Sequence, residues 1–252
     1  ELILELVQDP EDFDVAQLLD KMTANHVNGI VWGIPHIGNN VEAAVEFARQ
    51  SPNIPIVFTD IAPLPGISGV VVDNYLGGQL ATRHFIEQGH RVIGHISGPQ
   101  SYYSAQLRRK AWIETLGAHN LDNDLTLDHE GDWSVQSGAD AFEALMRRRP
   151  DITAVFAGND QMALGALYVA SRMNLRVPED VAIIGYDDIP ESQFFQPSLS
   201  SVRQNIVQMG ATAVEQLVSQ IERLQVGVVI EPRVSWIRPE LSIRDSSVAI
   251  RH

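Results

Sequence analysis

The chain alternates short apolar runs with stretches of helical periodicity, and this alternation constrains its fold more than any other feature. The pattern is clearest where the apolar run 153–157 ends at Gly158 and is followed by two polar residues, Asn159 and Asp160. A strand covered on both faces of a parallel sheet can be apolar throughout, and glycine lets the backbone turn at its end. The next apolar residues recur with the spacing of one helix face. They are Met162, Leu164, Ala166 and Leu167. The segment therefore predicts a buried strand that leads into a helix.

The same alternation runs through the rest of the chain. Strands are expected at 2–7, 29–33, 55–59, 69–72, 92–97, around 127, and at 153–157, 181–185, 199–203, 228–230 and 234–237. Helices are expected at 13–25, 41–50, 75–88, 104–118, 135–149, from the end of strand 153–157 to 173, and at 206–223. About ten strands are many for one compact sheet, so we predict an α/β fold with two doubly wound parallel sheets.

Composition excludes several classes of function. The net charge of −14 over 252 residues argues against a nucleic-acid or anionic-membrane surface within this chain. Cysteine is absent, which excludes disulfides and thiolate chemistry. No run approaches the ~20 apolar residues that span a bilayer, and the first residues lack the basic region and cleavage site of a signal peptide. We therefore expect a cytoplasmic protein with no membrane part. Because the chain opens without Met inside an expected strand, we also expect that it is a fragment and that any DNA-binding segment lies elsewhere.

Polar residues at strand ends and helix starts form a candidate ligand site, because ligands of open α/β sheets bind beyond the carboxyl ends of the strands. Carboxylates, amides and guanidinium groups hold sugar hydroxyls, while an aromatic face covers the apolar side of a pyranose ring. Asp73 and Asn74 also fall at such positions, and the candidate ligand-binding residues are Asp60, Ser104, Arg108, Trp133, Asn159, Asp187 and Gln204. Alone, Trp133 fits a partly buried core residue as well as a sugar platform, and Asn159 fits a helix cap as well as a ligand contact. Taken with the whole set, we interpret Asn159 as facing the ligand and Asp160 as serving the helix start.

The usual sequence supports of catalysis are missing. The histidines show no HExxH spacing, and there is no G-x-S-x-G elbow, no phosphate-binding G-x-x-x-x-G-K loop and no G-x-G pair. Asp187 and Asp188 are adjacent at a strand end and should point in different directions, so they do not form a facing acid pair. We therefore expect no metal, no cofactor and no enzymatic activity.

Four segments carry a resemblance to a known family. They are Gly131-Asp132-Trp133-Ser134, residues 158–165, residues 177–188 and residues 241–247. Together they resemble the effector-binding region of the lac-repressor/galactose-repressor family of transcription regulators, over essentially the whole chain. The resemblance implies a periplasmic-binding-protein-like fold of two subdomains, 1–73 plus 204–233 and 74–203 plus 234–252. It also implies three crossovers, near 72–74, 203–205 and 234–235.

The resemblance also implies roles for the site residues. Asp60 and Ser104 would bind sugar hydroxyls, Arg108 would bridge hydroxyls, and Trp133 would pack on the ring. Asn159, Asp187 and Gln204 would complete the polar shell between the lobes.

The function implied is that of the effector-binding and dimerisation domain of an allosteric, sugar-responsive repressor. A carbohydrate effector would change the operator affinity of a helix-turn-helix head that this chain does not contain. A homodimer would present two such heads, with residues 194–197 as the candidate interface or, equally, a piece of the core. Two alternatives remain at this point: a solute-binding protein of a sugar transporter, and a sugar-processing enzyme that uses Asp187 as a base.

Overall fold

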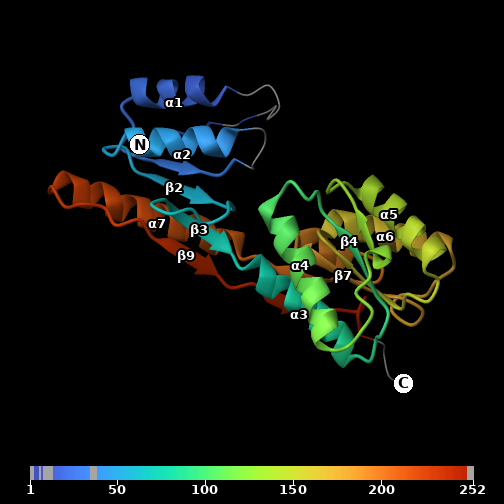
Figure 1. Cartoon of the computed structure of the whole chain (residues 1–252). Coiled ribbons are helices and arrows are strands. Elements are labelled where there is room, and N and C mark those ends of the chain that lie inside the picture. Colours follow the sequence, from blue (N-terminus) through green and yellow to red (C-terminus); the bar gives the residue numbers. More distant parts are fainter. Residues whose placement is uncertain (1–2, 6, 8–13, 35–38, 249–252) are drawn as a thin grey trace. The chain divides into compact units, whose positions relative to one another are not determined.

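The computed structural model describes residues 3–5, 7, 14–34 and 39–248, and the chain divides into two compact units. The first unit comprises Glu1–Val72 and Ile206–Ile237, and the second comprises Asp73–Asn205 and Arg238–His252. The chain therefore passes three times from one unit to the other. The predicted α/β fold with two doubly wound sheets is confirmed (Figure 1).

The first unit is a parallel sheet with helices on both faces. Its sheet has the order β1-β2-β3-β9, and α1 and α2 lie on one side while α7 lies on the other (Figure 1). Phe58 packs with the α1 and α2 side of the core, whereas its neighbour Val57 packs with Ala213 of α7. Successive strand residues point to opposite faces, which is why the strand can be apolar throughout. The elements are α1 (Val15–Ala24), β1 (Ile30–Trp32), α2 (Asn40–Gln50), β2 (Ile56–Thr59), β3 (Ser68–Val72), α7 (Ile206–Gln225) and β9 (Val234–Ile237).

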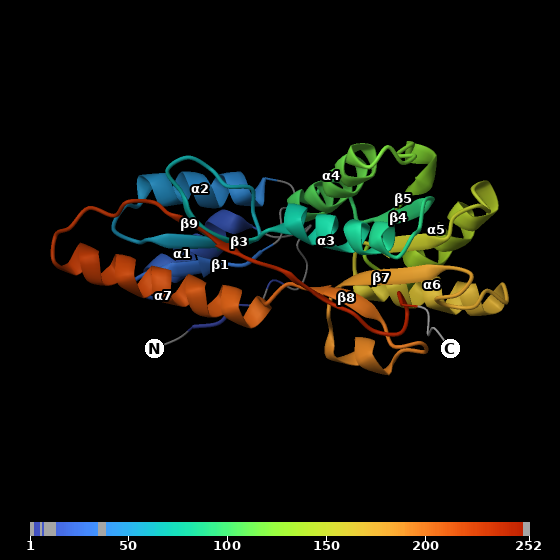
Figure 2. The same cartoon turned by 90° about the horizontal axis from the view of Figure 1, so that it is seen from below.

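The second unit has a six-stranded sheet of order β10-β8-β7-β6-β4-β5, between the helix pair α3 and α4 and the pair α5 and α6 (Figure 2). On β7, Tyr186 faces α3 and α4, where Gly77 and Arg108 contact its ring, while Gly185 faces Asp160 of α6. The helices are α3 (Asn74–Glu87), α4 (Tyr103–Ala118), η1 (Leu125–Leu127), α5 (Val135–Arg148), α6 (Asp160–Arg172) and η2 (Pro190–Phe194). The strands are β4 (Ile93–Ser97), β5 (Asp128–Glu130), β6 (Ala154–Ala157), β7 (Ala182–Asp187), β8 (Ser200–Arg203) and β10 (Glu240–Ser242).

The third crossing differs from its predicted place at 234–235. β9 pairs in parallel with β3, from Gly69 opposite Val234 to Val72 opposite Ile237. Residues 234–237 therefore lie in the first unit, and the crossing falls between Ile237 and Arg238. The other two crossings lie after Val72 and after Asn205, within the predicted ranges.

Three strand predictions also differ. Of the predicted strand 2–7, residues 3–5 and 7 are described and none of them is in a strand. Residues 228–230 form no strand either, since their apolar side chains follow a turn at Gly227 and stay largely exposed. β10 runs antiparallel to β8, so the second sheet is not wholly parallel. The carboxyl ends of β4, β6, β7 and β8 nevertheless share one edge, and Asn159, Asp187 and Gln204 lie at the ends of β6, β7 and β8.

Candidate ligand-binding site

Arg108 is the best-held residue of the candidate site. It lies in α4 and is only 5% exposed. Its Nε donates to Asn74 Oδ1 at 2.9 Å, and its Nη1 donates to the carbonyl oxygen of Gly158 at 2.6 Å. The ring of Tyr186 lies against the guanidinium group, with Cζ 3.6 Å from the ring centroid, a cation–π contact. The starts of α3 and α6 and the end of β7 thus fix this guanidinium in place.

The remaining donor of Arg108 is its Nη2 group. Within the part of the chain that the structure describes, Nη2 makes no hydrogen bond to a protein acceptor. A planar guanidinium with one nitrogen uncommitted can present N–H groups to hydroxyl oxygens in a fixed direction. The neighbouring Arg109 instead pairs with Asp128 at 2.7 Å. In the basic run Arg108-Arg109-Lys110, Arg108 is therefore the residue that turns into the buried interior.

Trp133 provides an aromatic surface next to Arg108. Its indole is half-buried, packs against the core of the second unit and meets the ring of Tyr102 edge-on, with centroids 5.8 Å apart. The Arg108 Cζ atom is 5.6 Å from the indole centroid. A Cβ atom at Gly98 would lie 2.0 Å from the indole Cη2, so only glycine admits the ring here. Trp133 is thus partly a core residue, and its contact with a sugar stays a prediction.

Asn159 is the N-cap of α6. Its Oδ1 accepts a hydrogen bond from the Met162 N–H at 2.8 Å, and its Nδ2 donates to the carbonyl oxygen of Trp133 at 2.9 Å. Both ends of the amide therefore bind protein, one fixing the helix start and the other the loop that carries the indole. The helix-capping interpretation is confirmed, while a ligand contact of Asn159 stays a prediction.

Asp160 does not serve the helix start, so that prediction was wrong. Its Oδ1 accepts from Ser201 Oγ at 2.6 Å and its Oδ2 accepts from the Ile189 N–H at 2.8 Å. Ser201 lies on β8 and Ile189 in the loop after β7, 41 and 29 residues further along the chain, and local helix-start statistics contain no information about them. Asp160 instead ties α6 to β8 and to the loop after β7.

Asp187 ends β7 with a left-handed backbone, φ 109°. Its Oδ1 accepts a hydrogen bond from Gln204 Nε2. Burial raises the pKa of Asp187, while the charge of Arg108 and the Gln204 hydrogen bond act in the opposite direction. Asp188 turns away and pairs with other arginines, so the prediction that these two acids do not face each other is confirmed.

Two predicted residues stand apart from this group. Ser104 is buried in the first turn of α4, four residues before Arg108 on the same side of the helix. Asp60 follows β2 in the first unit, is exposed and has φ 55°. Its part in a common site stays a prediction.

The predicted ligand-binding set lacks three contributors to the site. Asn74 begins α3 and orients Arg108, Tyr186 supplies the stacked ring, and Gly98 admits the indole. Asn74 follows a predicted strand end and is singled out by that position, although the sequence assigns no ligand contact to it. Tyr186 lies within an apolar run and carries no signal that separates it from a core aromatic residue.

The buried Asp160 should make stability depend on pH. Burial raises its pKa from 3.8 to about 7, and the charges of Asp187 and Asp188 add to this. Because the folded-state pKa exceeds the unfolded one, this contribution to stability is complete below about pH 4 and is lost as the pH rises to about 7. Asp160→Asn should remove this loss in urea unfolding measured from pH 4 to 8. Asp140→Asn, which changes an exposed carboxylate on α5, should keep the wild-type slope. An unchanged slope in Asp160→Asn would contradict the assignment.

Comparisons with known proteins agree with this architecture. A family model described as the periplasmic binding protein-like domain matches residues 82–247. The lactose operon repressor of Klebsiella pneumoniae is 35% identical over 201 residues, which are 80% of this chain and 55% of that protein. The chain thus spans about half the length of this curated relative.

Two solved structures resemble the chain closely. A transcriptional regulator CelR–cellobiose complex has 32% identity and a TM-score of 0.81, over 92% of this chain and 70% of that one. A lac repressor dimer bound to operator and the anti-inducer ONPF has 27% identity and a TM-score of 0.81, over 95% of this chain and 81% of that one.

Over the described residues, none of the helices combines the length and apolar character needed to cross a membrane.

Proposed function

This chain belongs to the lac-repressor/galactose-repressor family, and we propose that it is the effector-binding and dimerisation domain of a sugar-responsive transcriptional repressor. The observation that carries the sugar assignment is the arrangement around Arg108 at the carboxyl edge of the second sheet. A fixed guanidinium with an uncommitted nitrogen lies beside the indole of Trp133 and has the Asp187 carboxylate as its counter-charge. These are the groups that bind hydroxyls and cover the apolar face of a sugar ring.

The charges of the second unit favour a neutral sugar over a sugar phosphate. The other arginines near these loops are already paired: Arg109 with Asp128, and Arg203 and Arg244 both with Asp188. A phosphate dianion at Arg108 would therefore meet one guanidinium and the adjacent carboxylate Asp187. The negative charges of the phosphate and of Asp187 would repel each other, which opposes binding of a sugar phosphate.

The regulatory step is a shift between two states of the domain. A sugar shifts this equilibrium only by its differential affinity for the two states, typically ~1–3 kcal/mol of coupling free energy. With a net charge of −14, this chain itself is unsuited to DNA, so a helix-turn-helix head supplies the operator contact. A homodimer presents two heads, as the lac repressor dimer on its operator does, and acts in the cytoplasm.

The candidate dimer contact at residues 194–197 is narrower than the sequence suggested. Phe194 is 76% exposed, whereas Phe195 packs against the core of the second unit. Only Phe194 of this aromatic pair is therefore available to a partner, and its place in the dimer interface stays part of the proposal.

The relatives distinguish the proposed function from the two alternatives. Those reported above are a repressor and a regulator, which favours a repressor over a transporter component. Asp187 pairs with Gln204 and counters Arg108, so it is occupied as a binding group rather than poised as a base. We propose that the chain binds a sugar without turning it over, and the test is direct: binding without release of product, for cellobiose and for a chromogenic β-glucoside.

A thermal-shift screen tests the proposed function. Cellobiose, lactose and their component monosaccharides should include at least one ligand that raises the unfolding temperature, because a ligand of the native state alone stabilises it. At one hundred times its Kd the gain is about 2.7 kcal/mol, and roughly 2–4 °C per kcal/mol is expected for domains of 150–250 residues. Glucose 6-phosphate is the matched charged probe and should shift the temperature less than glucose does. No shift with any neutral sugar would contradict the proposal.

A further inference from the structure

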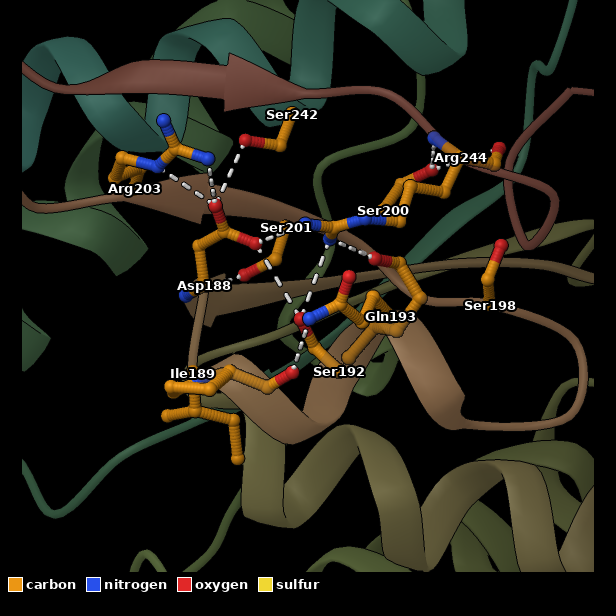
Figure 3. A network of polar contacts seen from close by, with 12 residues as sticks. Asp188, Ile189, Ser192, Gln193, Ser198, Ser200, Ser201, Arg203, Ser242 and Arg244 are labelled. Atoms are coloured by element: carbon orange, nitrogen blue, oxygen red, sulfur yellow. Dashed lines mark hydrogen bonds and ion pairs between the residues drawn. The ribbon is translucent and has the colours of Figure 1, made fainter.

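Asp188, which follows the site residue Asp187 in the chain, lies at the centre of a polar network (Figure 3). Its side chain is only 2% exposed. Oδ2 accepts from Arg203 Nε at 2.8 Å and from Ser242 Oγ at 2.9 Å, and it forms an ion pair with Arg203 Nη2 at 2.7 Å. Oδ1 accepts from Arg244 Nη2 at 2.6 Å and from Ser192 Oγ at 3.3 Å. One buried carboxylate thus binds β8, β10, η2 and the segment after β10.

The backbone around Asp188 has a conformation that requires such support. Asp187 and Asp188 have φ of 109° and 54°, values that residues with side chains rarely adopt. The Asp188 N–H donates to Ser201 Oγ at 3.0 Å, and the Ile189 N–H donates to Asp160 Oδ2 at 2.8 Å. Unusual backbone conformations persist where the surroundings over-determine them, and they cluster at functional sites. Here the network fixes the direction in which the preceding Asp187 leaves the strand.

The groups that Asp188 holds are neighbours of ligand-site residues. Asp187 precedes it directly, and Gln204, the hydrogen-bond donor to Asp187, follows Arg203 directly. Apart from the nearby Ser192, the partners come from residues 15, 54 and 56 positions away along the chain, so this geometry depends mainly on distant segments. β8 leads into the crossing after Asn205, and β10 follows the crossing after Ile237. Asp188 therefore connects the end of β7, which carries Asp187, to β8 and β10. These two strands lie next to the points where the chain crosses between its units.

We propose that Asp188 is a positioning residue of the ligand site: by gathering Arg203 and Arg244 it holds Asp187 and Gln204 in the geometry that binds a sugar. The part about sugar rests on the proposed function, whereas the positioning of Gln204 does not. A carboxylate with only a structural role would lower stability when replaced but leave the Asp187–Gln204 pair and the sugar affinity unchanged. The state of the Asp187–Gln204 hydrogen bond and the sugar affinity therefore distinguish a positioning role from a purely structural one.

The test uses the full chain with Asp188→Asn, which keeps the side-chain volume and removes the charge that two arginines share. The first readout is the side-chain amide signal of Gln204 in ¹⁵N–¹H NMR spectra without ligand. The chemical shifts of this signal should move toward those of a solvent-exposed glutamine side chain. The second readout is calorimetry with cellobiose, where the affinity should fall about tenfold, the equivalent of one charge-assisted hydrogen bond.

Two further variants keep the proposal open to refutation. Ser242→Ala removes a single hydrogen bond from Asp188 and should change both readouts in the same direction by a smaller amount. If Asp188→Asn does not fold, Ser242→Ala alone tests the positioning role. Asp128→Asn is the matched control. This carboxylate has a side chain 7% exposed, pairs with Arg109 at 2.7 Å and lies on the edge strand β5, so its loss should lower stability alone.

The outcomes are distinct. Unchanged Gln204 signals in folded Asp188→Asn or Ser242→Ala would overturn the positioning role, as would an equal effect of Asp128→Asn. A wild-type protein that binds none of the sugars would contradict the proposed function, and the NMR readout would still decide whether Asp188 positions Gln204.

Discussion

Arg108→Ala should lower the sugar affinity by at least about 100-fold, the equivalent of losing hydrogen bonds from a charged group worth about 3 kcal/mol. The guanidinium is the most fully oriented group of the site, held by Asn74, Gly158 and the face of Tyr186. Isothermal calorimetry with the best ligand of the thermal-shift screen measures the loss. Arg108→Lys should recover little affinity, because an ammonium group has neither the planar fork nor the stacking face.

The same change should also lower the stability of the folded protein. Alanine at 108 removes the buried donor of the Gly158 carbonyl, at about 1–3 kcal/mol, and also removes the hydrogen bond to Asn74. Calorimetry must therefore be done below the lowered unfolding temperature. Arg109→Ala is the matched control, because it removes the same charge from the next position and leaves Arg108 in place. Undiminished affinity in folded Arg108→Ala would place the sugar elsewhere.

Gly165→Ala should destabilise the second unit by about 3 kcal/mol or more, because α5 and α6 cross there with no room for a side chain. A Cβ atom at Gly165 would lie 2.1 Å from the Val135 carbonyl oxygen and 2.6 Å from the Ala139 nitrogen. Both are backbone atoms, so a rotamer change cannot relieve the clash. The helices would have to separate, and α6 begins at the junction that supplies Asn159 and the Gly158 carbonyl.

The control for this change is another glycine within a helix. Gly210 lies in α7, and nothing is within 4 Å of the Cβ atom it would gain. Gly210→Ala should stabilise the protein by roughly 0.5–1 kcal/mol, the ordinary difference in helix propensity. Urea unfolding of the two variants measures both effects. If both variants changed the free energy of unfolding by the same amount and in the same direction, helix propensity and not the helix crossing would govern position 165.

The candidate site shows which functional residues the sequence could reveal. Polar residues that follow apolar runs, such as Asp187 and Asn159, are visible because strand ends recur at one sheet edge. Arg108 is visible as the residue of a basic run that precedes an apolar helix face. Tyr186 is not, because its use as a stacking partner of Arg108 depends on two elements that are 78 residues apart in the chain, at 108 and 186.

The sequence by itself determined the alternation of strands and helices, the doubly wound class and the turn at Gly158, because each follows from the periodicity of neighbouring side chains. Tertiary structure alone decided that β9 joins the first sheet and that Asn159 rather than Asp160 caps α6. It also decided that Asp188 forms ion pairs with two arginines. Strand pairing and charge pairing join residues far apart in the chain. Their partners are selected by the packing of the whole unit, which local spacing does not encode.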